Sequence, residues 1–195
     1  MLLPSNNTSF TDVIFNLALG FIVLLFLVIF LINPPASKDI EKKADYVISL
    51  EWDKESKDDV DIWVRDPLGA VLSFTNRSRG FMFLDRDDLG IANDFVKLPN
   101  GKTKLIKLNR EVVTLRGTVP GWYTVNVHYY FTRGKIFTQK GKVEIVRINP
   151  YGVVSSVPFE LEKPGDEKTL YQFQVDENGV IVNFRQANVA LFGRR

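Results

Sequence analysis

An uninterrupted apolar segment near the N-terminus constrains this chain more than any other feature of its sequence. The segment from Val13 to Ile32 carries no charge, and Asn16 is its only strongly polar residue. A helix of about 20 residues covers a hydrocarbon core of roughly 30 Å. Because backbone amides in lipid must find their hydrogen bonds within the segment, a helix is the only single-segment solution. We therefore predict a transmembrane helix over residues 13–32.

A cleaved signal peptide is the alternative interpretation of this segment. Signal peptides begin with basic residues and have an apolar stretch of about 7–15 residues. The opening residues, MLLPSNNTSF, contain no Lys or Arg, and the apolar run is longer than such a stretch. Pro34 and Pro35 follow directly and end the helix. These features favour a retained membrane anchor.

Composition divides the chain into four parts. Residues 1–12 form a short N-terminal segment before the helix at 13–32, and residues 33–45 (NPPASKDIEKKAD) form a polar, proline-led linker. Residues 46–195 remain for a water-soluble domain. A segment of that length can bury the core of one β-sandwich or barrel.

Alternation of apolar and polar residues predicts strands throughout 46–195. The clearest such segments are Tyr46–Trp52, Asp61–Arg65, Ala70–Thr75, Trp122–Phe131 and Val180–Phe184. Turn-forming residues separate them, as at Asp66–Gly69 and Asp176–Gly179. Because no helical period is recognisable in this region, we predict an all-β antiparallel sandwich or a barrel-like variant of it.

Composition and motifs argue against catalysis, a cofactor or nucleic-acid binding. The chain has no cysteine and a net charge of +2, so it lacks thiolate chemistry and a strongly basic face. His128 is the only histidine, and it alternates with the apolar residues of its strand. We therefore expect His128 on the solvent-exposed face, and we expect the protein not to be an enzyme.

Four small or polar residues form a stripe at the start of the predicted helix. Thr8, Asp12, Asn16 and Gly20 are spaced by four and so share one helical face. An ionisable group at membrane depth costs about 2.5–3.5 kcal/mol at the helix centre and usually faces protein or water. The glycine would let a second helix approach closely. From the residues alone, two interpretations of Asp12 stay open: an ion-carrying residue, or a carboxylate that only caps the helix.

The stretch FTDVIFNL from Phe10 to Leu17, with Asn33-Pro34-Pro35 after the apolar run, resembles the transmembrane helix of the ExbD/TolR/MotB group of stator subunits. The resemblance covers residues 8–36. It implies that Asp12 carries the transported ion, usually a proton. It further implies that two copies of this chain stand inside a pentamer of a multi-spanning partner of the MotA/ExbB/TolQ type, in a bacterial inner membrane. The chain lacks the basic residues that commonly precede the helix in that group, and it lacks an OmpA-like pattern.

A second resemblance concerns the soluble domain. The residues LEWD at Leu50–Asp53 and DVDIWVRDPLG at Asp59–Gly69 are similar to the start of bacterial extracytoplasmic β-sandwich modules, and PGWYTVNV at 120–127 resembles a later strand of theirs. This implies a sandwich fold and a periplasmic or extracytoplasmic domain. The lysines at 38–43 weakly favour the opposite orientation.

Acidic residues gather in two places and raise the question of a calcium site, since carboxylates are calcium ligands. Asp85, Asp87 and Gly90 occupy the first, third and sixth positions of an EF-hand-like count, but Leu89 and Val96 occupy the fifth and twelfth. The weak candidate ligands are Asp85, Asp87 and Asp88. The alternative is a solvated charged loop. A second group of acids lies around the first hairpin, at Asp53, Asp58, Asp59, Asp61 and Asp66.

Two functions are consistent with these patterns. The first is the B-type subunit of a proton-driven stator complex, with Asp12 as the ion carrier and the domain as the mechanical output. The alternative is a membrane-tethered β-sandwich module for binding or assembly, in which the helix is only an anchor.

Overall fold

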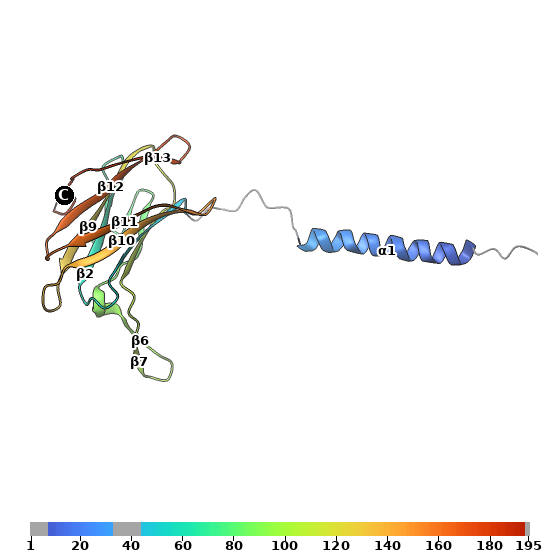
Figure 1. Cartoon of the computed structure of the whole chain (residues 1–195), viewed down its shortest axis with the longest axis horizontal. Coiled ribbons are helices and arrows are strands. Elements are labelled where there is room, and N and C mark those ends of the chain that lie inside the picture. The colour runs from blue at the N-terminus through green and yellow to red at the C-terminus, as the bar shows by residue number, and fades with distance from the viewer. Residues whose placement is uncertain (1–7, 33–43, 194–195) are drawn as a thin grey trace, which may run out of the picture. The chain divides into compact units, whose positions relative to one another are not determined.

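The computed structural model describes residues 8–32 and 44–193, which belong to two separate compact units (Figure 1). The first unit contains the helix α1 (Thr8–Ile32), and the second is an all-β antiparallel domain. The predicted fold class is therefore confirmed. Residues 33–43 of the predicted linker lie outside the described residues.

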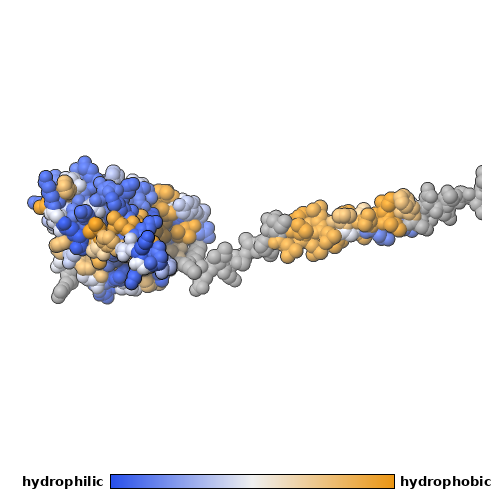
Figure 2. All heavy atoms as spheres, turned by 90° about the horizontal axis from the view of Figure 1, so that it is seen from below, coloured by the Kyte–Doolittle hydropathy of each residue, from blue (hydrophilic) through white to orange (hydrophobic). Residues whose placement is uncertain are grey.

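Helix α1 is apolar around its whole circumference, apart from a short polar patch toward its N-terminal end (Figure 2). By length and composition its 22-residue segment Phe10–Leu31 could cross a membrane. Every described side chain of this segment is exposed. An apolar surface of this extent needs lipid or another protein to cover it. Because α1 begins at Thr8, before the predicted start at Val13, it contains Asp12.

The β-domain consists of two main sheets and a small separate hairpin (Figure 1). The first sheet has the strand order β11-β10-β1-β8-β5-β4, and the second has the order β13-β12-β9-β2-β3. The hairpin is formed by β6 and β7. The strands are β1 (Tyr46–Trp52), β2 (Asp59–Arg65), β3 (Val71–Leu72), β4 (Ser78–Arg79), β5 (Met82–Arg86), β6 (Phe95–Lys97), β7 (Thr103–Leu105), β8 (Arg110–Leu115), β9 (Gly121–Phe131), β10 (Gln139–Arg147), β11 (Gly152–Leu161), β12 (Glu167–Val175) and β13 (Ile181–Arg185).

Alternating apolar residues of both sheets form one core. From the first sheet, Ile48 and Leu50 of β1 are fully buried; from the second, Val125 and Val127 of β9 are fully buried. Successive side chains of a strand point to opposite faces, so each strand contributes every second residue to this core. The core thus follows from the period-two pattern of the sequence, and the architecture is a sandwich.

The two turns predicted from the sequence close hairpins. Gly69 donates its amide to the carbonyl of Asp66 at 3.1 Å, and Gly179 does the same to Asp176 at 3.1 Å. The predicted strand Ala70–Thr75 is shorter than expected, since only Val71 and Leu72 pair with β2. The chain turns at Ser73, whose backbone pairs with Asn76 instead.

Strand β2 is buried on both faces. Val60, Ile62 and Val64 belong to the core, while Asp59 and Asp61 point away from it and are still only 3% and 2% exposed. The C-terminal segment, residues 186–193, covers part of the outer face of the second sheet, where its Phe192 ring packs against Trp63 with ring centroids 5.6 Å apart. Its backbone at 189 exchanges two hydrogen bonds with the Thr169 hydroxyl, at 3.0 and 2.9 Å. The C-terminal segment thus shields part of the outer face of the second sheet from solvent.

Close packing at Gly141 of β10 provides a test of the sandwich. A Cβ atom there would lie 2.1 Å from the Glu51 carbonyl oxygen and 2.7 Å from the Phe159 ring. Gly141→Ala should therefore lower the free energy of unfolding by about 1–3 kcal/mol, the usual cost of overpacking. Gly134→Ala is the matched control, because its Cβ would meet no atom within 4 Å. Urea denaturation of both variants measures the difference; equal stabilities would contradict this packing.

Candidate functional site

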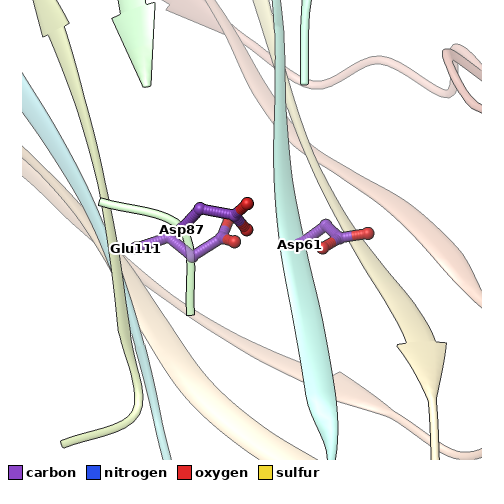
Figure 3. A group of neighbouring side chains, drawn as sticks. All are labelled: Asp61, Asp87 and Glu111. Carbon is purple, nitrogen blue, oxygen red and sulfur yellow. The ribbon is translucent and has the colours of Figure 1, made fainter. Parts of the chain in front are cut away.

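Three carboxylates from both sheets converge at one end of the sandwich. They belong to Asp61 of β2, Asp87 after β5 and Glu111 of β8, and one oxygen of each lies within 4.8 Å of the others. Figure 3 shows the Asp87 and Glu111 side chains next to each other, with Asp61 projecting from β2. We call these three residues the carboxylate cluster.

Glu111 is the most deeply buried member of the cluster, with no exposed surface. It shares the inward face of β8 with Val113 and Leu115. Strand β3 pairs with β2 only at Val64 and Arg65, so it does not reach the backbone amide of Ile62. The Glu111 Oε2 accepts a hydrogen bond of 2.7 Å from that amide instead. Its Oε1 has no hydrogen-bond partner among the described residues.

Asp61 lies directly across from His128 in the pairing of β2 with β9. The His128 Nδ1 is 3.8 Å from the Asp61 Oδ2, too far for a hydrogen bond, and both ring nitrogens lack partners among the described residues. The expectation that His128 is exposed is wrong, because His128 is only 2% exposed. The Phe192 ring of the C-terminal segment stacks on it at 4.1 Å.

Burial and mutual repulsion raise the pKa values of these acids. The pKa of Asp59 rises to about 8, chiefly through burial and then through the nearby charges of Asp61 and Asp87. Burial also raises the pKa of Asp61. For Glu111, burial and the charge of Asp61 hold the pKa well above its usual range. A fully ionised cluster is therefore unfavourable unless protons or a cation neutralise it.

The calcium candidates from the sequence separate in the structure, and only Asp87 joins the cluster. The Asp85 carboxylate is engaged by Arg116 at 2.8 Å and by the Thr114 hydroxyl at 2.7 Å. Asp88 is buried and paired with Arg86 at 2.7 Å. Both carboxylates thus have cationic partners.

Asp58, one of the acids around the first hairpin, has a structural role. It is buried and accepts hydrogen bonds from the Tyr129 hydroxyl at 2.5 Å, the Gln139 amide at 2.9 Å and the Arg133 backbone at 2.9 Å. These bonds attach the segment before β2 to the hairpin of β9 and β10.

Sequence reasoning did not select Glu111, although a signal for it exists. In REVVTL, which becomes β8, Glu111 is in phase with Val113 and Leu115 and therefore points to the apolar side. A carboxylate on the inward face of a strand indicates a partnered or functional acid.

The four residues of the polar stripe all lie in α1. Thr8 is the first residue of the helix, and Asp12 and Asn16 are exposed in the part described. A Cβ atom at Gly20 would meet nothing within 4 Å. Because their spacing of four keeps them on one face, the stripe is available to a partner helix.

Comparisons with known proteins do not assign a function to this chain. No family model and no curated protein matches it. Among solved structures, it is similar to the crystal structure of a protein of unknown function, SAV2460, with 18% sequence identity and a TM-score of 0.44. The match covers 75% of this chain and 89% of that one.

The raised pKa of Asp59 predicts a pH-dependent effect of Asp59→Asn. When unfolded, the Asp59 carboxyl ionises near 3.8, whereas the folded protein keeps it protonated up to about 8. Its contribution to stability is therefore complete below about pH 4 and is lost as the pH rises to about 8. Since Asn has no proton to release, the stability of Asp59→Asn relative to wild type should increase over that range.

Urea denaturation at several pH values, with EDTA present, measures this difference. Asp176→Asn is the control of opposite sign, because backbone hydrogen bonds from Val180 and Asn178 lower the pKa of Asp176. The stabilisation by Asp176 is present above its unfolded pKa and is lost as the pH falls through the folded one. An Asp59→Asn difference that stays constant from pH 4 to 8 would contradict the prediction.

Proposed function

We propose that this chain is a single-pass membrane subunit of a stator-type complex, in which Asp12 carries an ion, most simply a proton. The observation that carries the proposal is the position of Asp12 within an apolar helix. It lies inside the segment Phe10–Leu31 and on the same face as Asn16 and Gly20. A simple anchor requires no such group.

The position of Asp12 also speaks against a pure capping role. No acidic residue lies in the first turn of α1, because the helix begins at Thr8. Carboxylates stabilise a helix N-terminus mainly within that first turn, where the unpaired amides lie. Asp12 follows one turn later, beyond the unpaired amides, so its carboxylate needs a partner other than the helix N-terminus.

Ion transfer needs a larger assembly than one helix. Moving one charge through the membrane potential releases about 2.3 kcal/mol per 100 mV, but a lone helix encloses no path for it. The exposed apolar face of α1 suits burial against other spanning helices. We therefore infer a multi-spanning partner of the MotA/ExbB/TolQ type that surrounds two copies of this chain.

The β-domain would be the output of this complex. It is a compact unit with its own core, so it can transmit force as one body. We place the N-terminus in the cytoplasm of a bacterial cell and the domain in the periplasm, following the two sequence resemblances over the lysines at 38–43. The second candidate function, a tethered binding module, is favoured by the separate carboxylate cluster of the domain.

Asp12→Asn tests the stator proposal directly. Asn is nearly isosteric but cannot carry a proton, so the variant should insert and bind its partner normally while the cellular activity of the complex is lost. Asp12→Glu keeps the titratable group and should retain part of the activity. Asn16→Leu is the control on the same face and should impair activity less. Complementation of a deletion strain measures activity, with membrane fractionation and copurification as checks; full complementation by Asp12→Asn would end the proposal.

Two copies of α1 in one complex should crosslink through the polar face. The chain has no cysteine, so single cysteines can be placed without background. Asn16→Cys and Gly20→Cys should give disulfide-linked dimers in oxidised membranes. Cysteines on the opposite face, at Ile14 or Ala18, should do so less efficiently. Absence of crosslinks at every position from 9 to 24 would argue against a two-copy arrangement.

A further inference from the structure

We propose that the carboxylate cluster of Asp61, Asp87 and Glu111 binds a calcium ion, which joins the two sheets of the sandwich. This site belongs to the β-domain and does not depend on the role of α1.

Unpartnered oxygen atoms point to a missing ligand. The Glu111 Oε1, the Asp61 Oδ2 and the Asp87 Oδ1 are all buried and accept no hydrogen bond from the described residues. Asp59, the preceding outward residue of β2, adds a fourth such atom, its Oδ1. Buried polar atoms in folded proteins are almost always satisfied, and each orphan is costly. Several orphaned oxygens from three chain segments indicate a group with positive charge.

The described side chains supply little of that charge. The Arg77 Nη1 lies 3.9 Å from the Asp87 Oδ2, and the Arg77 side chain is 54% exposed, so water screens the pair. His128 makes no hydrogen bond to Asp61. By contrast, the neighbouring carboxylates of Asp85 and Asp88 each have an arginine within 2.8 Å. Within the described residues, the cluster is thus the part of this acidic region without an arginine or lysine closer than 3.9 Å.

The ligand chemistry favours calcium among the common divalent ions. Calcium binds carboxylate oxygens at about 2.3–2.6 Å, so two oxygens on opposite sides of it are separated by about 4.6–5.2 Å. One oxygen of each cluster residue lies within 4.8 Å of the others, so the three carboxylates can reach one calcium ion together. Magnesium binds at about 2.0–2.1 Å in near-ideal octahedral geometry and usually keeps several waters, so a buried site made of carboxylates suits calcium better. Zinc prefers nitrogen and sulfur ligands, which the three cluster residues do not offer.

The position of the cluster gives the ion a structural consequence. Asp61 lies in the second sheet, whereas Glu111 lies in the first and Asp87 follows a strand of the first. An ion held by all three would replace mutual repulsion of the carboxylates by attraction to a common centre. It would therefore fasten the sheets to each other and hold the loop that contains Asp87.

Calcium binding to the full-length chain in detergent tests the proposal by two independent readouts. The first is thermal unfolding with calcium or with EGTA; at free calcium of about one hundred times Kd, the Tm should rise by roughly 5–10 °C. The second is luminescence of terbium, a calcium mimic, excited through tryptophan. Trp63 is two residues from Asp61 on the same face of β2, so bound terbium should be sensitised and calcium should displace it.

Three variants locate the site. Glu111→Gln and Asp61→Asn should abolish the calcium-dependent rise in Tm and reduce terbium luminescence at least tenfold. Without calcium, Glu111→Gln should melt no lower than wild type, because it removes repulsion and its amide oxygen can still accept from Ile62. Asp85→Asn is the matched control: it removes a nearby carboxylate that is engaged by Arg116, so both calcium responses should persist.

Two outcomes would overturn the proposal. If calcium changes neither the Tm nor the terbium signal of the wild type, the carboxylates are neutralised by protons. If both responses survive in Glu111→Gln and Asp61→Asn, calcium binds elsewhere on the chain.

Discussion

The burial of strand β2 on both faces is the constraint on which the organisation of the β-domain depends. An ordinary sandwich strand places apolar residues in the core and polar residues in water. In β2 the apolar set occupies the core, but the opposite set, Asp59, Asp61 and Trp63, is also buried, and Phe192 of the C-terminal segment packs on Trp63. Two carboxylates on one short strand are thereby removed from water. Buried carboxylates need hydrogen-bond donors, protonation or a bound cation.

The same constraint explains why unrelated parts of the chain meet at one end of the sandwich. Because β3 pairs with β2 at only two positions, the Ile62 amide is left for a side-chain acceptor. The Glu111 side chain reaches this amide from the facing sheet, which places its carboxyl group in the interior. The loop after β5 then places Asp87 beside them. The carboxylates of the two sheets therefore come together where the backbone pairing of β2 with β3 ends.

Local patterns in the sequence predict most of the β-domain and the helix. Alternation in Tyr46–Trp52 and Trp122–Phe131 identifies β1 and β9, since side chains of period two belong to a half-buried strand. The burial of His128 could not be predicted in this way, because it depends on Phe192, far away in the sequence. The carboxylate cluster was missed for the same reason: Asp61, Asp87 and Glu111 come from separate segments that only the sheet topology brings together.

The capture of the Ile62 amide by Glu111 has a consequence for association between copies of the chain. An unpaired strand edge offers its amides and carbonyls to a strand of another molecule, and many proteins block such edges with charged side chains. Here the Glu111 carboxylate of the same chain occupies the Ile62 amide inside the domain, and two further carboxylates lie beside it. Glu111 would thus keep the Ile62 amide from pairing with a strand of another copy.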